Sequence, residues 1–174
     1  KRLIGGFMLV AALLSMWMTN TSTTMMLMPI ALSVATVIAD NNSHLTSQQT
    51  QSFKVAMLLG LAYAATIGGL ATLVGTPPNA LLAAFLTENY GIKITFANWM
   101  LVGVPVMAVM LPLAWLSLTR VSFKIDIPAN PAVNDHLKQL KEDLGPMSLA
   151  EKRVAIVFVS VVFPLKTSKE SLYF

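Results

Sequence analysis

Long apolar stretches, separated by short polar ones, dominate the sequence. No Asp, Glu, Lys, Arg or His occurs in residues 3–39, 55–87 or 94–119. Each of these runs is longer than the roughly 20 apolar residues that carry an α-helix across a bilayer. The pattern therefore predicts an all-α integral membrane protein.

The first run contains two apolar legs on either side of a polar cluster, residues 19–24. As a helix the first leg, residues 3–18, is about 24 Å long at ~1.5 Å per residue, short of the roughly 30 Å hydrocarbon core. The pattern favours a re-entrant helical hairpin over residues 1–40 with a Thr-Asn-Thr tip. Two short helices that each cross the membrane would also leave both ends of the segment on the same side, so both interpretations stay open.

The second predicted segment, residues 54–87, is too long for one straight crossing, because its uncharged part spans about 50 Å as a helix. Glycine and proline residues supply a break within residues 67–79. We expect a helix to about Ile67, an unwound stretch to Thr76, and a second half-helix. Thr76 is then the N-cap and Pro77 the first helical residue, where a missing N–H costs nothing. Residues 41–53 form the connector before this discontinuous helix.

The next segments read as a polar loop, residues 88–97, and an intact transmembrane helix, residues 98–119. Trp99 and Trp115 lie near the ends of this helix, as in the aromatic belts of membrane proteins.

Residues 120–153 form the longest polar segment. An apolar stripe at helical spacing predicts a surface helix within it, made by Val133, Leu137, Leu140 and Leu144. Ser148 and Glu151 form a capping box that opens another helix. Residues 154–165 then begin a further transmembrane helix, and residues 166–174 are expected to be a remnant of truncation or of an added tag.

Charge and composition agree with a membrane protein. Only 11% of the residues are charged, against about 25% in ordinary domains, and the mean hydropathy is +0.67. The positive-inside rule places residues 41–53 and 120–153 in the cytoplasm and residues 88–97 outside, because only Lys93 falls on the outer side. The net charge of +4 is explained by this bias, so no nucleic-acid partner is expected.

The two polar interruptions are the candidate functional site. Irregular backbone at membrane depth survives only inside protein or around a cavity, and broken helices form substrate sites in secondary transporters. Helix N-termini attract anions, while freed carbonyls and Ser, Thr or Asn oxygens suit a monovalent cation. Since no carboxylate or histidine lies in the uncharged runs, coupling to Na⁺ is favoured over coupling to H⁺. A simple helix kink or helix–helix hydrogen bonding is the alternative reading.

The residues of both interruptions resemble a known family. The segment Ser15–Thr24 resembles the first hairpin of the divalent-anion:sodium symporter family, whose hallmark is Ser-Asn-Thr. The segment Ile67–Asn79 resembles the unwound segment of that family's following helix. The order and spacing of the two motifs also match, and the resemblance covers residues 1 to about 160. Thr19 stands where the family usually has Ser, and the family's second, inverted copy of both motifs is absent from this chain.

The resemblance implies sodium-coupled symport of C4-dicarboxylates such as succinate, or of citrate or sulfate, by homodimers in a bacterial inner membrane. This chain would be one half of an inverted-repeat transporter and too incomplete to transport alone. By the same resemblance, the substrate-binding residues are Thr19, Asn20, Thr21, Thr76 and Pro77. The sodium-binding residues are Ser15, Thr19, Asn20, Ile67, Gly68 and Asn79.

Three other functions compete with this one, and of these an enzyme is not expected. A sodium-independent exchanger, or a proton- or arsenite-type carrier, could share this architecture. A membrane-embedded enzyme would need a nucleophile, metal cluster or paired acids in the apolar runs, and the sequence has none there. A non-transporting fragment is the third.

Overall fold

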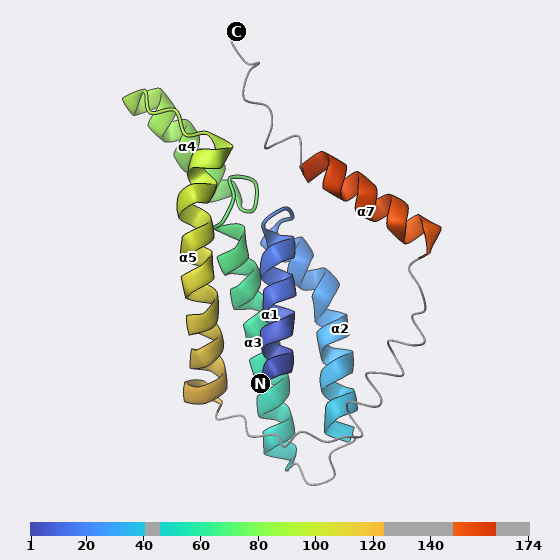
Figure 1. The fold of residues 1–174 in the computed structure, drawn as a ribbon. Coiled ribbons are helices and arrows are strands. Elements are labelled where there is room, and N and C mark those ends of the chain that lie inside the picture. Colours follow the sequence, from blue (N-terminus) through green and yellow to red (C-terminus); the bar gives the residue numbers. More distant parts are fainter. Residues whose placement is uncertain (41–45, 124–147, 163–174) are drawn as a thin grey trace. The chain divides into compact units, whose positions relative to one another are not determined.

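Figure 1 shows the computed structural model of the chain, which describes residues 1–40, 46–123 and 148–162. All regular structure in these ranges is helical, as predicted. The helices are α1 (Arg2–Ser15), α2 (Asn20–Asp40), α3 (Ser47–Gly69), α4 (Pro77–Tyr90), α5 (Phe96–Leu116), the π-helix η1 (Ser117–Ser122) and α7 (Leu149–Val162). The predicted surface helix with the stripe of Val133, Leu137, Leu140 and Leu144 lies outside the described residues, as does the tail of residues 166–174.

The chain divides into two units, residues 1–130 and residues 131–174. In the second unit, α7 opens with the predicted capping box. The Ser148 N–H donates to Glu151 Oε2 at 2.8 Å, and the Glu151 N–H donates to Ser148 Oγ at 3.2 Å. These reciprocal bonds satisfy two N–H groups that a helix start leaves without partners.

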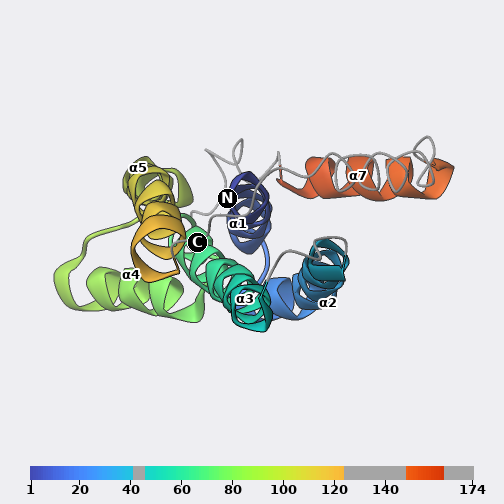
Figure 2. The ribbon, with the colours of Figure 1, turned by 90° about the horizontal axis from the view of Figure 1, so that it is seen from below.

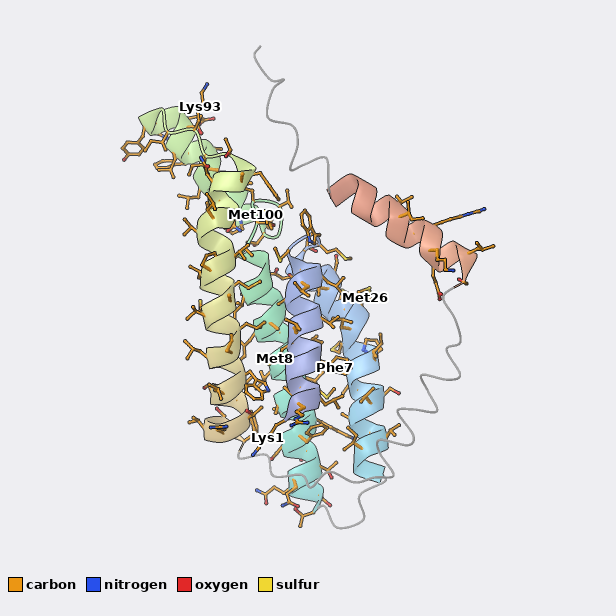
Figure 3. All side chains as sticks on the ribbon, viewed as in Figure 1. Lys1, Phe7, Met8, Met26, Lys93 and Met100 are labelled. Atoms are coloured by element: carbon orange, nitrogen blue, oxygen red, sulfur yellow. The ribbon has the colours of Figure 1, made fainter. Side chains whose placement is uncertain are left out.

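In the first unit, three helical segments are long and apolar enough to cross a membrane: Asn20–Ile38, Ser47–Gly69 and Phe96–Ser122. Helix α1 is apolar but shorter. Figure 3 shows Lys93 at one end of this unit and Lys1 toward the other, as the predicted sidedness requires. Which end faces the cytoplasm stays a prediction.

Helix α3 is the centre of the first unit and contacts α1, α2 and α5, as the end view in Figure 2 shows. Its buried face consists mainly of small residues, which let neighbouring helices approach closely. They are Ala56, Gly60, Ala64, Ala65, Gly68 and Gly69. A side chain at Gly60 would press on Ile4 and Met8, and one at Gly68 would collide with the backbone of Ala12. The glycines of α3 therefore hold α1 close along its length.

Helix α3 begins earlier than the sequence analysis placed it. The predicted connector was residues 41–53, but the helix starts at Ser47. A capping box explains the difference, because the Gln49 N–H donates to Thr46 Oγ1 at 3.3 Å and the Thr46 N–H donates to Gln49 Oε1 at 3.0 Å. The Thr-x-x-Gln signal was present in the sequence and was missed.

The predicted loop of residues 88–97 is also shorter in the structure. Helix α4 continues to Tyr90 and ends at Gly91, whose φ of 67° lies in the left-handed region that glycine adopts readily. The Thr95 hydroxyl accepts the Asn98 N–H at 3.2 Å and caps α5. Only residues 91–95 connect the two helices.

Candidate functional site

The linker between α1 and α2 is shorter than the predicted polar tip. Helix α1 ends at Ser15 and α2 begins at Asn20, so most of the polar cluster lies in the first turns of α2. The cause is N-capping by Thr19, whose hydroxyl oxygen accepts the Ser22 N–H at 3.3 Å. The Thr19 hydroxyl itself donates to Ser22 Oγ at 2.8 Å. Residues 16–19 alone connect the helices.

Asn20 is held at the start of α2 by two hydroxyl groups. The Ser15 hydroxyl donates to Asn20 Oδ1 at 2.7 Å, and the Thr24 hydroxyl donates to the Asn20 carbonyl at 2.8 Å. Ser15 is fully buried. The structure therefore brings together Ser15 and Asn20, two residues that the sequence analysis assigned to sodium.

The break between α3 and α4 occurs within the expected residues. Helix α3 ends at Gly69, and α4 begins at Pro77 with Thr76 as its extended N-cap residue (φ −150°, ψ 139°). The Thr76 side chain makes no capping hydrogen bond. The Ile67 carbonyl accepts the Leu70 N–H at 3.3 Å, and the Gly68 carbonyl accepts the Ala71 N–H at 3.0 Å. Each carbonyl keeps a second lone pair for another partner.

Two buried polar side chains hold the break in shape. Asn79 Nδ2 donates to the carbonyls of Gly69, at 3.0 Å, and Thr72, at 2.7 Å. The Thr72 hydroxyl donates to the Met16 carbonyl at 2.5 Å and accepts the Gly75 N–H at 3.0 Å. Asn79 thus satisfies the Gly69 carbonyl, which the end of α3 leaves without a helical partner, and the Thr72 carbonyl within the break. Thr72 is not among the predicted site residues, although it is a hydroxyl residue inside a segment predicted to leave the helix.

The linker and the break lie side by side. A Cβ atom at Gly69 would collide with Asn20 Oδ1, and one at Gly75 would lie 2.9 Å from the Ser15 carbonyl oxygen. Figure 1 shows both segments at the same end of α1 and α3. The first two turns of α5 complete the surroundings, because Trp99 Nε1 donates to the Leu70 carbonyl at 3.0 Å. Only glycine allows such close approach of backbone to side chain here.

The other predicted residues lie at the edge of this cluster. Thr19, Thr21 and Pro77 are exposed, and Thr76 is half-buried. Thr23, which the sequence analysis did not assign, is fully buried one turn after Asn20, and its hydroxyl has no hydrogen-bond partner within the described ranges.

The site consists of neutral oxygens and helix ends. Among the described residues, no group of three or more His, Asp or Glu side chains could hold a metal ion. The N-termini of α2 and α4 both begin at the cluster, and each carries roughly half a positive charge. Such an arrangement offers helix dipoles and oxygen lone pairs to an ion, without a titrating group.

The regular structure of the described residues is helical, with three candidate membrane-spanning segments and two polar helix interruptions in contact, and broken helices of this kind occur in secondary transporters. The family comparison agrees. Residues 1–169 match the citrate transporter family, and the chain belongs to that family of integral membrane transporters, not to an enzyme family.

Curated relatives show the same class. The chain is 38% identical over 160 residues to proteins named sodium-dependent dicarboxylate transporter SdcS, from Staphylococcus aureus strains USA300 and NCTC 8325. The match covers 91% of this chain but 31% of each relative. The chain thus spans about a third of the length of these relatives.

Proposed function

We propose that this chain is part of a larger protein that performs sodium-coupled symport of small divalent anions such as C4-dicarboxylates. The observation that carries the proposal is the contact between the linker and the break, where Asn20 lies against Gly69 and Thr72 bonds to Met16. The names of the relatives, which are sodium-dependent dicarboxylate transporters, support the choice of ion and substrate.

The cation site is proposed to use oxygens from both segments. The Ser15 and Asn20 side-chain oxygens already lie 2.7 Å apart on the linker side. On the break side, the carbonyls of Ile67 and Gly68 each have one bonded N–H and a second lone pair. Asn79 contributes by shaping the break with its amide nitrogen. Neutral oxygen ligands of this kind suit a monovalent cation.

The anion is proposed to bind at the exposed rim of the same cluster. Thr19, Thr21, Thr76 and Pro77 lie at the beginnings of α2 and α4. Helix N-termini present unpaired N–H groups and partial positive charge, which favour a carboxylate. A sodium ion held by Asn20 adds a full positive charge beside the carboxylate, and this attraction couples the two ligands.

Coupling then follows from charge. Each sodium ion entering in excess of the substrate's negative charge gains about 2.3 kcal/mol per 100 mV of membrane potential. The bacterial relatives favour a bacterial inner membrane. The re-entrant form of residues 1–40, a second inverted copy of the site and assembly as a homodimer belong to the same proposal.

Uptake by the complete protein tests the proposal. Radiolabelled succinate, citrate and sulfate are offered to proteoliposomes with inward gradients of Na⁺, K⁺ or H⁺. Asn20→Ala removes the shared ligand and is expected to abolish sodium-dependent uptake. Asn89→Ala is the matched control, because Asn89 is an exposed asparagine whose Nδ2 only bonds the Phe85 carbonyl within α4.

The outcomes separate the alternatives. Uptake that follows the Na⁺ gradient and is lost only in Asn20→Ala supports symport through this site. Uptake driven by H⁺, or indifferent to the cation, identifies a proton-coupled carrier or an exchanger instead. Normal uptake by a folded Asn20→Ala variant shows that the site assignment is wrong.

A further inference from the structure

We propose that Thr72 is a positioning residue that fixes the spacing between the two halves of the site and thereby sets the sodium affinity. The inference rests on the proposed function, because it assigns a role within the same sodium site. In this role the Thr72 hydroxyl bonds to the protein in both directions, as donor and as acceptor, and is not itself proposed as an ion ligand. It acts through the segments that it joins.

The geometry of the Thr72 hydroxyl supports this role. Its O–H donates to the carbonyl of Met16, 56 positions away in the sequence, and its oxygen accepts the Gly75 N–H. The Thr72 side chain is fully buried, Met16 is 7% exposed, and Gly75 is buried. One hydroxyl therefore joins three places: Met16 in the linker, Thr72 in the middle of the break and Gly75 near the end of the break.

The remaining contacts show why this link matters. Within the described ranges, the side-chain bonds of Asn79 stay inside the break, and the Ser15–Asn20 bond stays beside the linker. The bond from Thr72 to Met16 is the side-chain hydrogen bond that joins the two segments there. An ion held by oxygens of both segments needs a fixed spacing between them. Loss of this link therefore weakens ion binding without removing a ligand.

Three substitutions isolate the hydroxyl. Thr72→Val keeps the shape but removes both hydrogen bonds and leaves the Met16 carbonyl and the Gly75 N–H unpaired. Thr72→Ala and Thr72→Ser both remove the methyl group and differ only in the hydroxyl. Thr66→Val is the matched control in α3, because the exposed Thr66 hydroxyl only bonds the Ala62 carbonyl four residues earlier.

The first measurement is the sodium dependence of dicarboxylate uptake by the complete protein. Thr72→Val and Thr72→Ala both lose the buried hydrogen bonds of the hydroxyl and leave the bonded groups unpaired. This loss is expected to raise the half-saturating sodium concentration by about tenfold. The Thr72→Ser and Thr66→Val variants keep the wild-type value. At saturating sodium the KM for the dicarboxylate stays unchanged, which a general loss of structure would not produce.

The second measurement does not depend on transport. Hydrogen exchange of peptides covering residues 16–20 and 70–76 is compared among the same purified variants. Faster exchange in both peptides is expected for Thr72→Ala and not for Thr72→Ser. If Thr72→Val fails to fold, the Ala and Ser pair still decides the question.

The results distinguish the two proposals. If the wild-type protein shows no sodium-dependent uptake, the proposed function fails, whatever the exchange data show. If uptake is sodium-dependent but Thr72→Ala and Thr72→Ser have the same sodium affinity, the positioning role of Thr72 is wrong.

Discussion

The contact between Gly69 and Asn20 offers a direct way to disturb the site while keeping the fold. A Cβ atom at Gly69 would collide with Asn20 Oδ1 and lie 3.2 Å from Asn20 Cγ and 3.3 Å from Nδ2. These are side-chain atoms, so the amide can rotate away without moving a helix. Rotation breaks the Ser15–Asn20 hydrogen bond and removes Asn20 Oδ1 from its position.

The cost to stability is small. Loss of the Ser15–Asn20 bond costs about 0.5–1.5 kcal/mol, whereas replacing a helical glycine by alanine stabilises a helix by about 0.5–1 kcal/mol. The two effects nearly cancel, so Gly69→Ala is expected to fold with a melting temperature close to that of the wild type. Sodium binding loses a proposed ligand oxygen, and we expect the half-saturating sodium concentration to rise more than about tenfold, which corresponds to about 1.4 kcal/mol.

The assay is sodium-dependent dicarboxylate uptake by the complete protein, paired with thermal unfolding in detergent. Gly6→Ala is the matched control, because a Cβ atom at Gly6 in α1 has no neighbour within 4 Å. A Gly69→Ala variant with wild-type sodium affinity would refute the role of Asn20 Oδ1 at this position. A variant that fails to fold would refute the estimate that the side chain can move aside.

Two further predictions concern stability. At Gly68 a Cβ atom would lie 2.6 Å from Ala12 Cα and 2.7 Å from Ala12 C, so α1 and α3 must separate. Gly68→Ala is expected to destabilise the protein by about 1–3 kcal/mol, measured as a lower melting temperature than that of Gly6→Ala; equal melting temperatures would contradict the packing argument. Sodium is expected to raise the melting temperature of the complete protein. At a sodium concentration one hundred times the dissociation constant of the sodium site, the free energy of unfolding increases by about 2.7 kcal/mol. Potassium at equal ionic strength should have no such effect, and a sodium shift that persists in Asn20→Ala would place the ion elsewhere.

Local features of the chain were predictable because their signals lie close together in the sequence. The uncharged runs predicted membrane-spanning helices, and three helical segments of suitable length and composition are present. Thr76 followed by Pro77 predicted where α4 begins, and Ser148 with Glu151 predicted a capping box. Each signal depends on backbone N–H groups within one helical turn, so no distant contact is needed to interpret it.

Competing local signals caused the errors. The cluster of hydroxyl and amide residues is predicted to form the tip of a hairpin, but Thr19 caps α2 and draws Asn20 and the residues after it into the helix. The capping box of Thr46 and Gln49 similarly starts α3 inside the predicted connector. In both places a side chain satisfies the first N–H groups, which lets a polar segment begin a helix.

The glycine and proline residues were enough to predict the break between α3 and α4, and the residue types showed that the polar side chains there are neutral and carry oxygen atoms. The contact of Asn20 with Gly69 and the bond from the Thr72 hydroxyl to the Met16 carbonyl became visible only in the folded chain. These partners are separated by long stretches of chain, and their contact depends on how closely α1, α2 and α3 pack. That closeness comes from small residues along α3. The number of residues between two positions in the sequence does not tell how far apart they lie once the helices are packed.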